Sequence, residues 1–222
     1  MAVQPLSEKT AIAGVGWSEF SRNSGTTAAE LVARASLMAI EDAGLSVDDI
    51  DGVVGLFWHD ANATISARAL ARMLGLPALK FDYFHDGGGW WNTAAVLSAA
   101  TLVYSGMCNN VLVYTGRNAY SEGRATRGGG ASGARGPAQF TQPFGHYHAA
   151  ATFGQIATAN MARYGLTTLD FAHLAVTQRQ NAILNKKAMM RKPITVEDHQ
   201  NSRRSEERRV GKECRSRWSP YH

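Results

Sequence analysis

The sequence contains little cysteine and no long apolar run. Two cysteines in 222 residues exclude a disulfide-stabilised scaffold and fit a reducing, cytoplasmic setting. The absence of 18 consecutive apolar residues argues against a transmembrane helix. The start of the chain, MAVQPLSE, lacks the basic and apolar regions of a secretory signal. Because 45% of the residues are hydrophobic, intrinsic disorder of the bulk of the chain is also excluded.

The positive charge is concentrated at the end of the chain. Residues 204–222, RSEERRVGKECRSRWSPYH, have no helical or alternating apolar period. They resemble the translation of a sequencing-library adapter, so we expect an artefactual tail rather than a basic nucleic-acid-binding segment. This tail holds six of the 23 Lys/Arg and three of the 18 Asp/Glu, which lowers the net charge from +5 to +2 for the remainder. We therefore expect no nucleic-acid partner.

Apolar stretches separated by glycine, proline and capping residues predict alternating strands and helices. Thr27, Thr167 and Thr195 are each followed three residues later by Glu or Asp, a pattern typical of helix starts. The alternation predicts an α/β fold with a mostly parallel sheet covered on both faces. The expected strands are 10–15, 53–57, 79–84 and 111–115, and the expected helices are 27–43, 65–74, 93–104, 149–164, 169–184 and one from 196.

The most distinctive local feature is the sequence HDGGGWWN at residues 85–92, between an expected strand and an apolar helix. Its glycines, Gly87, Gly88 and Gly89, permit unusual backbone conformations and close approach of a ligand. Free amides at the start of the helix can stabilise an anion or a developing oxyanion. A tight turn without a ligand fits the same residues. The sequence is neither a GxGxxG fingerprint nor a P-loop.

Histidines provide further candidates. His85 and Asp86 could form an acid/base pair, although neighbouring residues of this kind more often form a structural pair. His146 and Tyr147 are candidate substrate contacts. His146 and His148 also form an H-x-H pattern, but no third ligand is spaced to complete a metal site. We therefore expect no metal.

Aromatic and basic residues complete the candidate site. Trp90 and Trp91 could line an apolar pocket, or belong to the core or a dimer interface. The stretch 123–138 is rich in glycine and is too long for a simple connection. Its arginines could meet phosphates of a ligand or lie in a solvated loop. They are Arg124, Arg127 and Arg135.

Several short motifs resemble those of the thiolase superfamily. In order, they are AGLS at 43–46, DDIDGV at 48–53, FG at 153–154, MARYG at 161–165, FAHL at 171–174 and RKPITVED at 191–198. Together they resemble the non-specific lipid-transfer protein branch, or sterol-carrier-protein-X-type thiolases, over nearly all of residues 1–203. The resemblance implies a thiolase-type N-terminal βαβαβαβ half with its loop region, truncated before the last strand, in a protein that forms a homodimer. We expect an α/β core at 1–122, a loop region with helices at 123–203 and the artefactual tail at 204–222.

The nucleophile of thiolases is absent. In that family the turn before the buried helix reads C-x-S-G, and the positions that match here are GWWN at 89–92. Because Gly89 has no side chain, the alignment excludes acyl-enzyme chemistry at this position. Cys108 lies beyond a helix roughly 20 Å long and cannot substitute. The resemblance implies that the catalytic residues lie in a C-terminal half, so we expect this chain alone to be inactive and to fold poorly.

A cysteine-free glycine turn resembles the lipid-transfer-protein-like aldolases of bacterial steroid side-chain breakdown. Those enzymes cleave a β-hydroxyacyl-CoA by a retro-aldol step and work with a DUF35-type OB-fold partner. The step requires a base and stabilisation of the thioester enolate, but no covalent carrier. The resemblance thus implies carbon–carbon bond cleavage or formation on acyl-CoA thioesters in lipid metabolism, with coenzyme A as part of the substrate.

Two alternatives stay open: a non-catalytic acyl-CoA- or lipid-binding or scaffold subunit, and an acyl-CoA acetyltransferase. The second needs a cysteine that reaches the thioester from elsewhere. Hydrogen bonds to the thioester oxygen could come from Tyr114, Tyr120 or Tyr147, and the sequence favours none of them.

Overall fold

The computed structural model describes residues 6, 8–21, 23–57, 65–86, 91–118, 139–144, 146 and 149–202. The chain divides into two compact units, Met1–Ala125 and Thr126–His222, which are described separately. The glycine-rich stretch 123–138 and the tail 204–222 lie outside the described residues. Within the described part, no helix is both long and apolar enough to cross a membrane.

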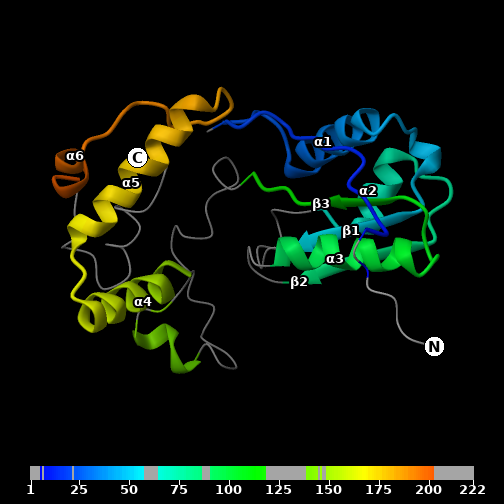
Figure 1. The fold of residues 1–222 in the computed structure, drawn as a ribbon. Coiled ribbons are helices and arrows are strands. Elements are labelled where there is room, and N and C mark those ends of the chain that lie inside the picture. Colours follow the sequence, from blue (N-terminus) through cyan, green and yellow to red (C-terminus); the bar gives the residue numbers. More distant parts are fainter. Residues whose placement is uncertain are drawn as a thin grey trace. The chain divides into compact units, whose positions relative to one another are not determined.

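A parallel sheet of three strands forms the centre of the first unit, in the order β2–β1–β3. The strands are β1 (Gly52–Phe57), β2 (Phe81–Asp86) and β3 (Val111–Tyr114). Helices α1 (Ala28–Asp42) and α2 (Ala67–Leu74) cover one face of the sheet, and α3 (Trp91–Tyr104) covers the other (Figure 1). A short 3₁₀ helix, η1 (Val47–Asp49), precedes β1. The α/β expectation is confirmed.

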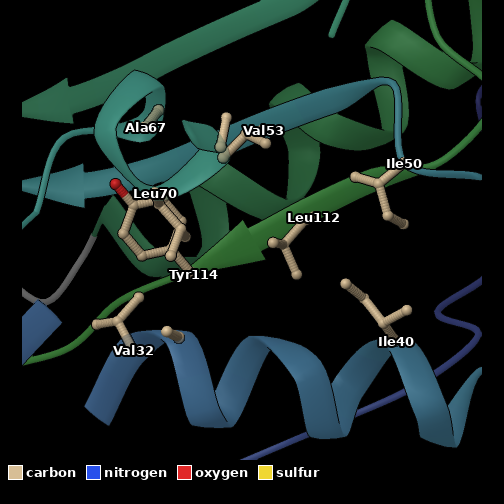
Figure 2. Packing of buried hydrophobic residues seen from close by; sticks show 10 residues of the cluster. Val32, Ile40, Ile50, Val53, Ala67, Leu70, Leu112 and Tyr114 are labelled. Carbon is tan, nitrogen blue, oxygen red and sulfur yellow. The ribbon is translucent and has the colours of Figure 1, made fainter. Parts of the chain in front are cut away.

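Strand β1 is apolar on both faces because it lies between two helical layers. Val53 packs with α1, α2 and β3 on one side, whereas Val54 packs with α3 on the other, and both are fully buried. Figure 2 shows the first cluster, in which Leu70 of α2 and Leu112 of β3 surround Val53. Such continuous apolar runs are typical of central strands in parallel sheets.

The strand predicted at 10–15 is wrong, since the described chain forms no strand there. The segment instead lies against α1. An added Cβ at Gly14 would be only 2.3 Å from the carbonyl oxygen of Ala39. The Val15 amide donates to a carboxylate oxygen of Asp42 at 2.9 Å. A strand needs a neighbouring strand with which to exchange backbone hydrogen bonds, and the described sheet provides none at this position.

The second unit contains one short 3₁₀ helix and three α-helices among its described residues, and the last two begin at the predicted caps. They are η3 (Gln142–Phe144), α4 (Ala149–Tyr164), α5 (Thr168–Leu184) and α6 (Val196–Gln200). Thr167 and Thr195 form the expected capping boxes with Asp170 and Asp198. At the α1 start, the Thr27 hydroxyl accepts from the Glu30 amide as predicted. The Glu30 carboxylate, however, bonds Thr26 and Arg34.

Two contacts fasten α5 to the segment that follows it. Gln200 exchanges hydrogen bonds with Thr168, its Nε2 donating to the carbonyl and its Oε1 accepting from the hydroxyl, both at 3.0 Å. The buried Arg179 donates from Nη1 to the Lys192 carbonyl at 2.7 Å. The connection from α5 to α6 is therefore tied to the helix in two places.

Asp51 joins the starts of all three strands. Its carboxylate accepts from the backbone amides of Asn109 and Asn110, just before β3, at 2.9 Å and 3.0 Å. It also accepts from Lys80 Nζ, just before β2, at 2.9 Å. The Asp51 carbonyl accepts from the Lys80 amide at 2.8 Å, and its own amide donates to the Asn110 carbonyl at 3.2 Å. One residue therefore aligns the amino edge of the sheet.

Burial of Asp51, whose side chain is 6% exposed, by itself raises its pKa. The amides of Asn109 and Asn110 and the Lys80 ammonium outweigh this effect, so the pKa lies below its ordinary value. The ionised carboxylate is thus the form that holds the sheet together.

Substituting Asp51→Ala should lower the free energy of unfolding by about 3 kcal/mol, because the backbone amides of Asn109 and Asn110 lose a charged acceptor. Asp48→Ala is the matched control: its side chain is exposed on η1, so it should change stability by less than about 0.5 kcal/mol. Chemical denaturation followed by circular dichroism measures both. Equal effects of the two substitutions would contradict the structural role of Asp51.

Stability should also fall on acidification through Asp51. Its contribution is complete above its unfolded-state pKa, about 3.9, and is lost as the pH falls through the lower folded-state pKa. In denaturation between pH 7 and about pH 3, Asp51→Asn should therefore lose less stability than the unmodified protein. Other carboxylates titrate equally in both proteins, so parallel curves would exclude Asp51 as the source.

Candidate functional site

The carboxyl edge of the sheet is the place where open parallel sheets usually bind ligands. Here β2 ends at Asp86 and α3 begins at Trp91. The predicted site residues Gly87, Gly88, Gly89 and Trp90 fall between them, outside the described residues. Tyr147 and the three arginines, Arg124, Arg127 and Arg135, also lie outside, so their roles stay predictions.

His85 is a buried residue held from three sides. Its side chain lies on β2 and is 8% exposed. The Nε2 atom is 2.9 Å from Ser98 Oγ of α3. Its ring stacks on the Trp91 ring, with centroids 5.6 Å apart and planes at 24°, and meets the Tyr83 ring edge-on at 4.7 Å. These contacts indicate a firmly oriented imidazole.

The two other candidate residues that the structure describes, Asp86 and His146, belong to different units of the chain. Asp86 pairs with Phe57 in the register of β2 and β1. His146 belongs to the second unit, where its Nε2 lies 2.7 Å from Thr152 Oγ1. The grouping of His146 with His85 in one site therefore stays a prediction. Among the described residues, no cluster of three or more His, Cys, Asp or Glu is suited to hold a metal.

The partial positive charge at the amino end of α3 is not neutralised by acidic side chains of the helix itself. No acidic residue occupies the first turn, and no charged residue occurs anywhere from 91 to 110. The first amides of a helix have no partner within the helix and carry partial positive charge. Together these features suit an anionic or oxyanionic group.

Helix α3 is apolar on nearly every side, yet the described residues cover only one of its faces. Ala95, Ala99 and Leu102 pack on the sheet, whereas Val96 is 42% and Leu97 is 57% exposed. Its buried face supports the sheet, and its outer apolar face has no cover among the described residues. An apolar sequence makes burial of every helix face possible, but a face is buried only where another part of the chain packs on it.

Two groups considered as possible reactive groups, the Tyr114 hydroxyl and the Cys108 thiol, have structural roles. The Tyr114 hydroxyl donates to the Ile65 carbonyl at 2.5 Å, and burial raises its pKa. Cys108 is 1% exposed at the amino edge of the sheet, where its Sγ is 3.8 Å from the Asp51 carbonyl oxygen. Burial, followed by the Asp51 charge, raises the pKa of this thiol, which disfavours the reactive thiolate. Cys108 is thus a buried thiol with a structural role.

Two polar residues, Ser98 and Asn118, were not predicted from the sequence. Asn118 follows β3 at the carboxyl edge and is 7% exposed. Its Nδ2 donates to the Thr26 carbonyl at 2.6 Å, and its Oδ1 accepts from the Ser24 hydroxyl at 3.0 Å. A polar residue shortly after an apolar strand was the available signal for Asn118. No local pattern distinguished Ser98.

Two curated proteins are similar to this chain in sequence. The chain is 39% identical over 207 residues to 17-hydroxy-3-oxo-4-pregnene-20-carboxyl-CoA lyase of Mycobacterium tuberculosis. It is 38% identical over 199 residues to a steroid side-chain-cleaving aldolase of Thermomonospora curvata. The matches cover 89% and 87% of this chain but 52% and 50% of the relatives. The chain therefore spans about half the length of these relatives. No family model matches it.

Solved structures agree with these sequence matches. The Ltp2–ChsH2(DUF35) aldolase superposes with a TM-score of 0.74 at 38% identity, covering 87% of this chain and 48% of that one. A monomeric SCP2-thiolase-like protein type 1 from Mycobacterium smegmatis matches at 0.64 and 20% identity, covering 87% and 39%. An acetyl-CoA acetyltransferase from Syntrophomonas wolfei matches at 0.59 and 22% identity, covering 80% and 49%. The last two share the fold alone.

Proposed function

We propose, from the thiolase-type fold and the homology to steroid side-chain-cleaving aldolases, that the protein carrying this chain cleaves a carbon–carbon bond of a β-hydroxyacyl-CoA. The observation that carries the proposal is the identity of 38–39% with two such enzymes over nearly nine-tenths of the chain. Gly89 at the position of the thiolase nucleophile supports it, because a retro-aldol step needs no covalent acyl carrier.

The name of the mycobacterial relative suggests the substrate class. A hydroxyl at carbon 17 and a thioester carboxyl at carbon 20 place the hydroxyl β to the thioester carbonyl. We therefore propose a β-hydroxyacyl-CoA with a bulky, steroid-like acyl group. Coenzyme A enters as part of the substrate, and Arg124, Arg127 and Arg135 are proposed to meet its phosphates. No covalently bound cofactor is required.

The proposed reaction runs through an enolate. A base removes the hydroxyl proton, the bond between the α and β carbons breaks, and the former hydroxyl carbon becomes a ketone. The electron pair moves to the α carbon as the thioester enolate, which is protonated to release a shortened acyl-CoA. The uncompensated amino end of α3 is the proposed site of enolate stabilisation.

We propose His85, Asp86, Gly87, Gly88, Gly89 and Trp90, which precede this helix in the sequence, as substrate contacts of the first unit. His146 and Tyr147 of the second unit are proposed as separate substrate contacts. Tyr114 is engaged in the core. We place the base outside residues 1–203, because the resemblance to thiolases implies that the catalytic residues lie in a C-terminal half. A protein without such a base would be the non-catalytic acyl-CoA-binding or scaffold subunit.

A partner protein and a cytoplasmic location belong to the same proposal. The similar Ltp2–ChsH2(DUF35) aldolase supports a DUF35-type partner, and the scarcity of cysteine supports a reducing compartment. We also propose a homodimer formed along β2, an edge strand of the described sheet. Exposed strand edges readily pair with another chain, and Tyr83 on this strand is 46% exposed.

The activity test uses the protein expressed from its full coding sequence, with and without a DUF35-type partner. A 17-hydroxysteroid-20-carboxyl-CoA should yield a 17-ketone and a shortened acyl-CoA, detected by mass spectrometry. Cys108→Ala should keep kcat within about twofold, because this thiol is buried far from the helix start. A covalent acyl adduct on the protein, or activity lost in Cys108→Ala while the fold is retained, would contradict the mechanism. Binding without turnover would support the scaffold alternative.

The dimer test is a light-scattering mass measurement. Tyr83→Lys should convert a dimer into a monomer, because a buried charge at an edge-to-edge contact is unfavourable. Tyr104→Lys, at a residue of α3 with 40% exposure, is the matched control and should leave the mass unchanged. A monomeric unmodified protein, as in the SCP2-thiolase-like neighbour described as monomeric, would refute the dimer.

A further inference from the structure

His85 connects the end of β2 to the first two turns of α3. Trp91 and Ser98 lie seven residues apart on α3, so they occupy the same helix face at a spacing of roughly 10 Å. The imidazole reaches both, by stacking on Trp91 and by the hydrogen bond to Ser98. The Tyr83 ring also contacts the imidazole, edge-on.

This arrangement differs from that of an acid/base residue. A proton-transferring group needs an accessible ring nitrogen that meets the reacting atom. The Nε2 atom of His85 instead bonds a half-buried hydroxyl on the supporting helix. A serine hydroxyl can donate to a neutral ring nitrogen or accept from a protonated one. The bond to Ser98 is therefore available in either protonation state.

We infer that Ser98 is a positioning residue, which acts through His85 to set the amino end of α3 relative to the end of β2. The inference rests on the proposed function, since it assigns to α3 the stabilisation of the enolate. Catalytic donors must be held within about 0.5 Å of their productive place, and small displacements cost rate rather than binding. The hydroxyl of Ser98 thereby supports the transition state without touching the substrate.

The kinetic test compares three substitutions in the full-length protein. Ser98→Ala removes the hydroxyl, and Ser98→Cys replaces it with a weak donor of similar size. Both should lower kcat by about tenfold with KM within about twofold. Ser98→Thr restores a hydroxyl and should recover most of the rate. Ser105→Ala is the matched control, because its hydroxyl bonds the Leu102 carbonyl at the far end of the helix and should leave kcat unchanged.

A spectroscopic test separates this inference from the proposed function. The imidazole nitrogen signals of His85 in two-bond proton–nitrogen spectra, and the fluorescence of the tryptophans, should change in Ser98→Ala but not in Ser105→Ala. These signals are read without substrate, so an inactive unmodified protein refutes the proposed function alone. Unchanged His85 signals, or a loss of stability in Ser98→Ala with kcat retained, would overturn the positioning role.

Discussion

The ionised carboxylate of Asp51 is the interaction on which the sheet depends. Parallel strands are joined by long crossover connections, so nothing local aligns their starts. Asp51 accepts hydrogen bonds from the residues that precede both neighbouring strands. Because the register is thereby set at the amino edge, it is also set at the carboxyl edge, where β2 ends and α3 begins.

The amino and carboxyl edges of the sheet carry different kinds of residues. The amino edge holds the charged residues Asp51 and Lys80 together with the buried Cys108, all engaged with one another or with backbone. The carboxyl edge holds the oriented His85 and the start of a helix without acidic residues in its first turn. The one described thiol thus lies at the amino edge of the sheet and away from the start of α3.

Several apolar surfaces of the described chain are exposed. They include the outer face of α3, with Val96 and Leu97, and the extended segment around Val15. The chain spans about half the length of its curated relatives, and large exposed apolar surfaces usually mark contacts with other parts of a protein. Within the first unit, the same helix therefore supports the sheet on one side and presents an apolar surface on the other.

The sequence by itself determined the positions of most helices and strands, because caps and apolar runs are local features. Threonine caps located the starts of α1, α5 and α6, and apolar runs located β1, β2 and β3. Only the tertiary structure decided which side chains meet. The partners of Asp51, the contact of His85 with Ser98 and the missing strand at 10–15 all depend on residues distant in sequence. Local pattern specifies whether a segment can be a helix or a strand, whereas hydrogen-bond partners are supplied by the fold.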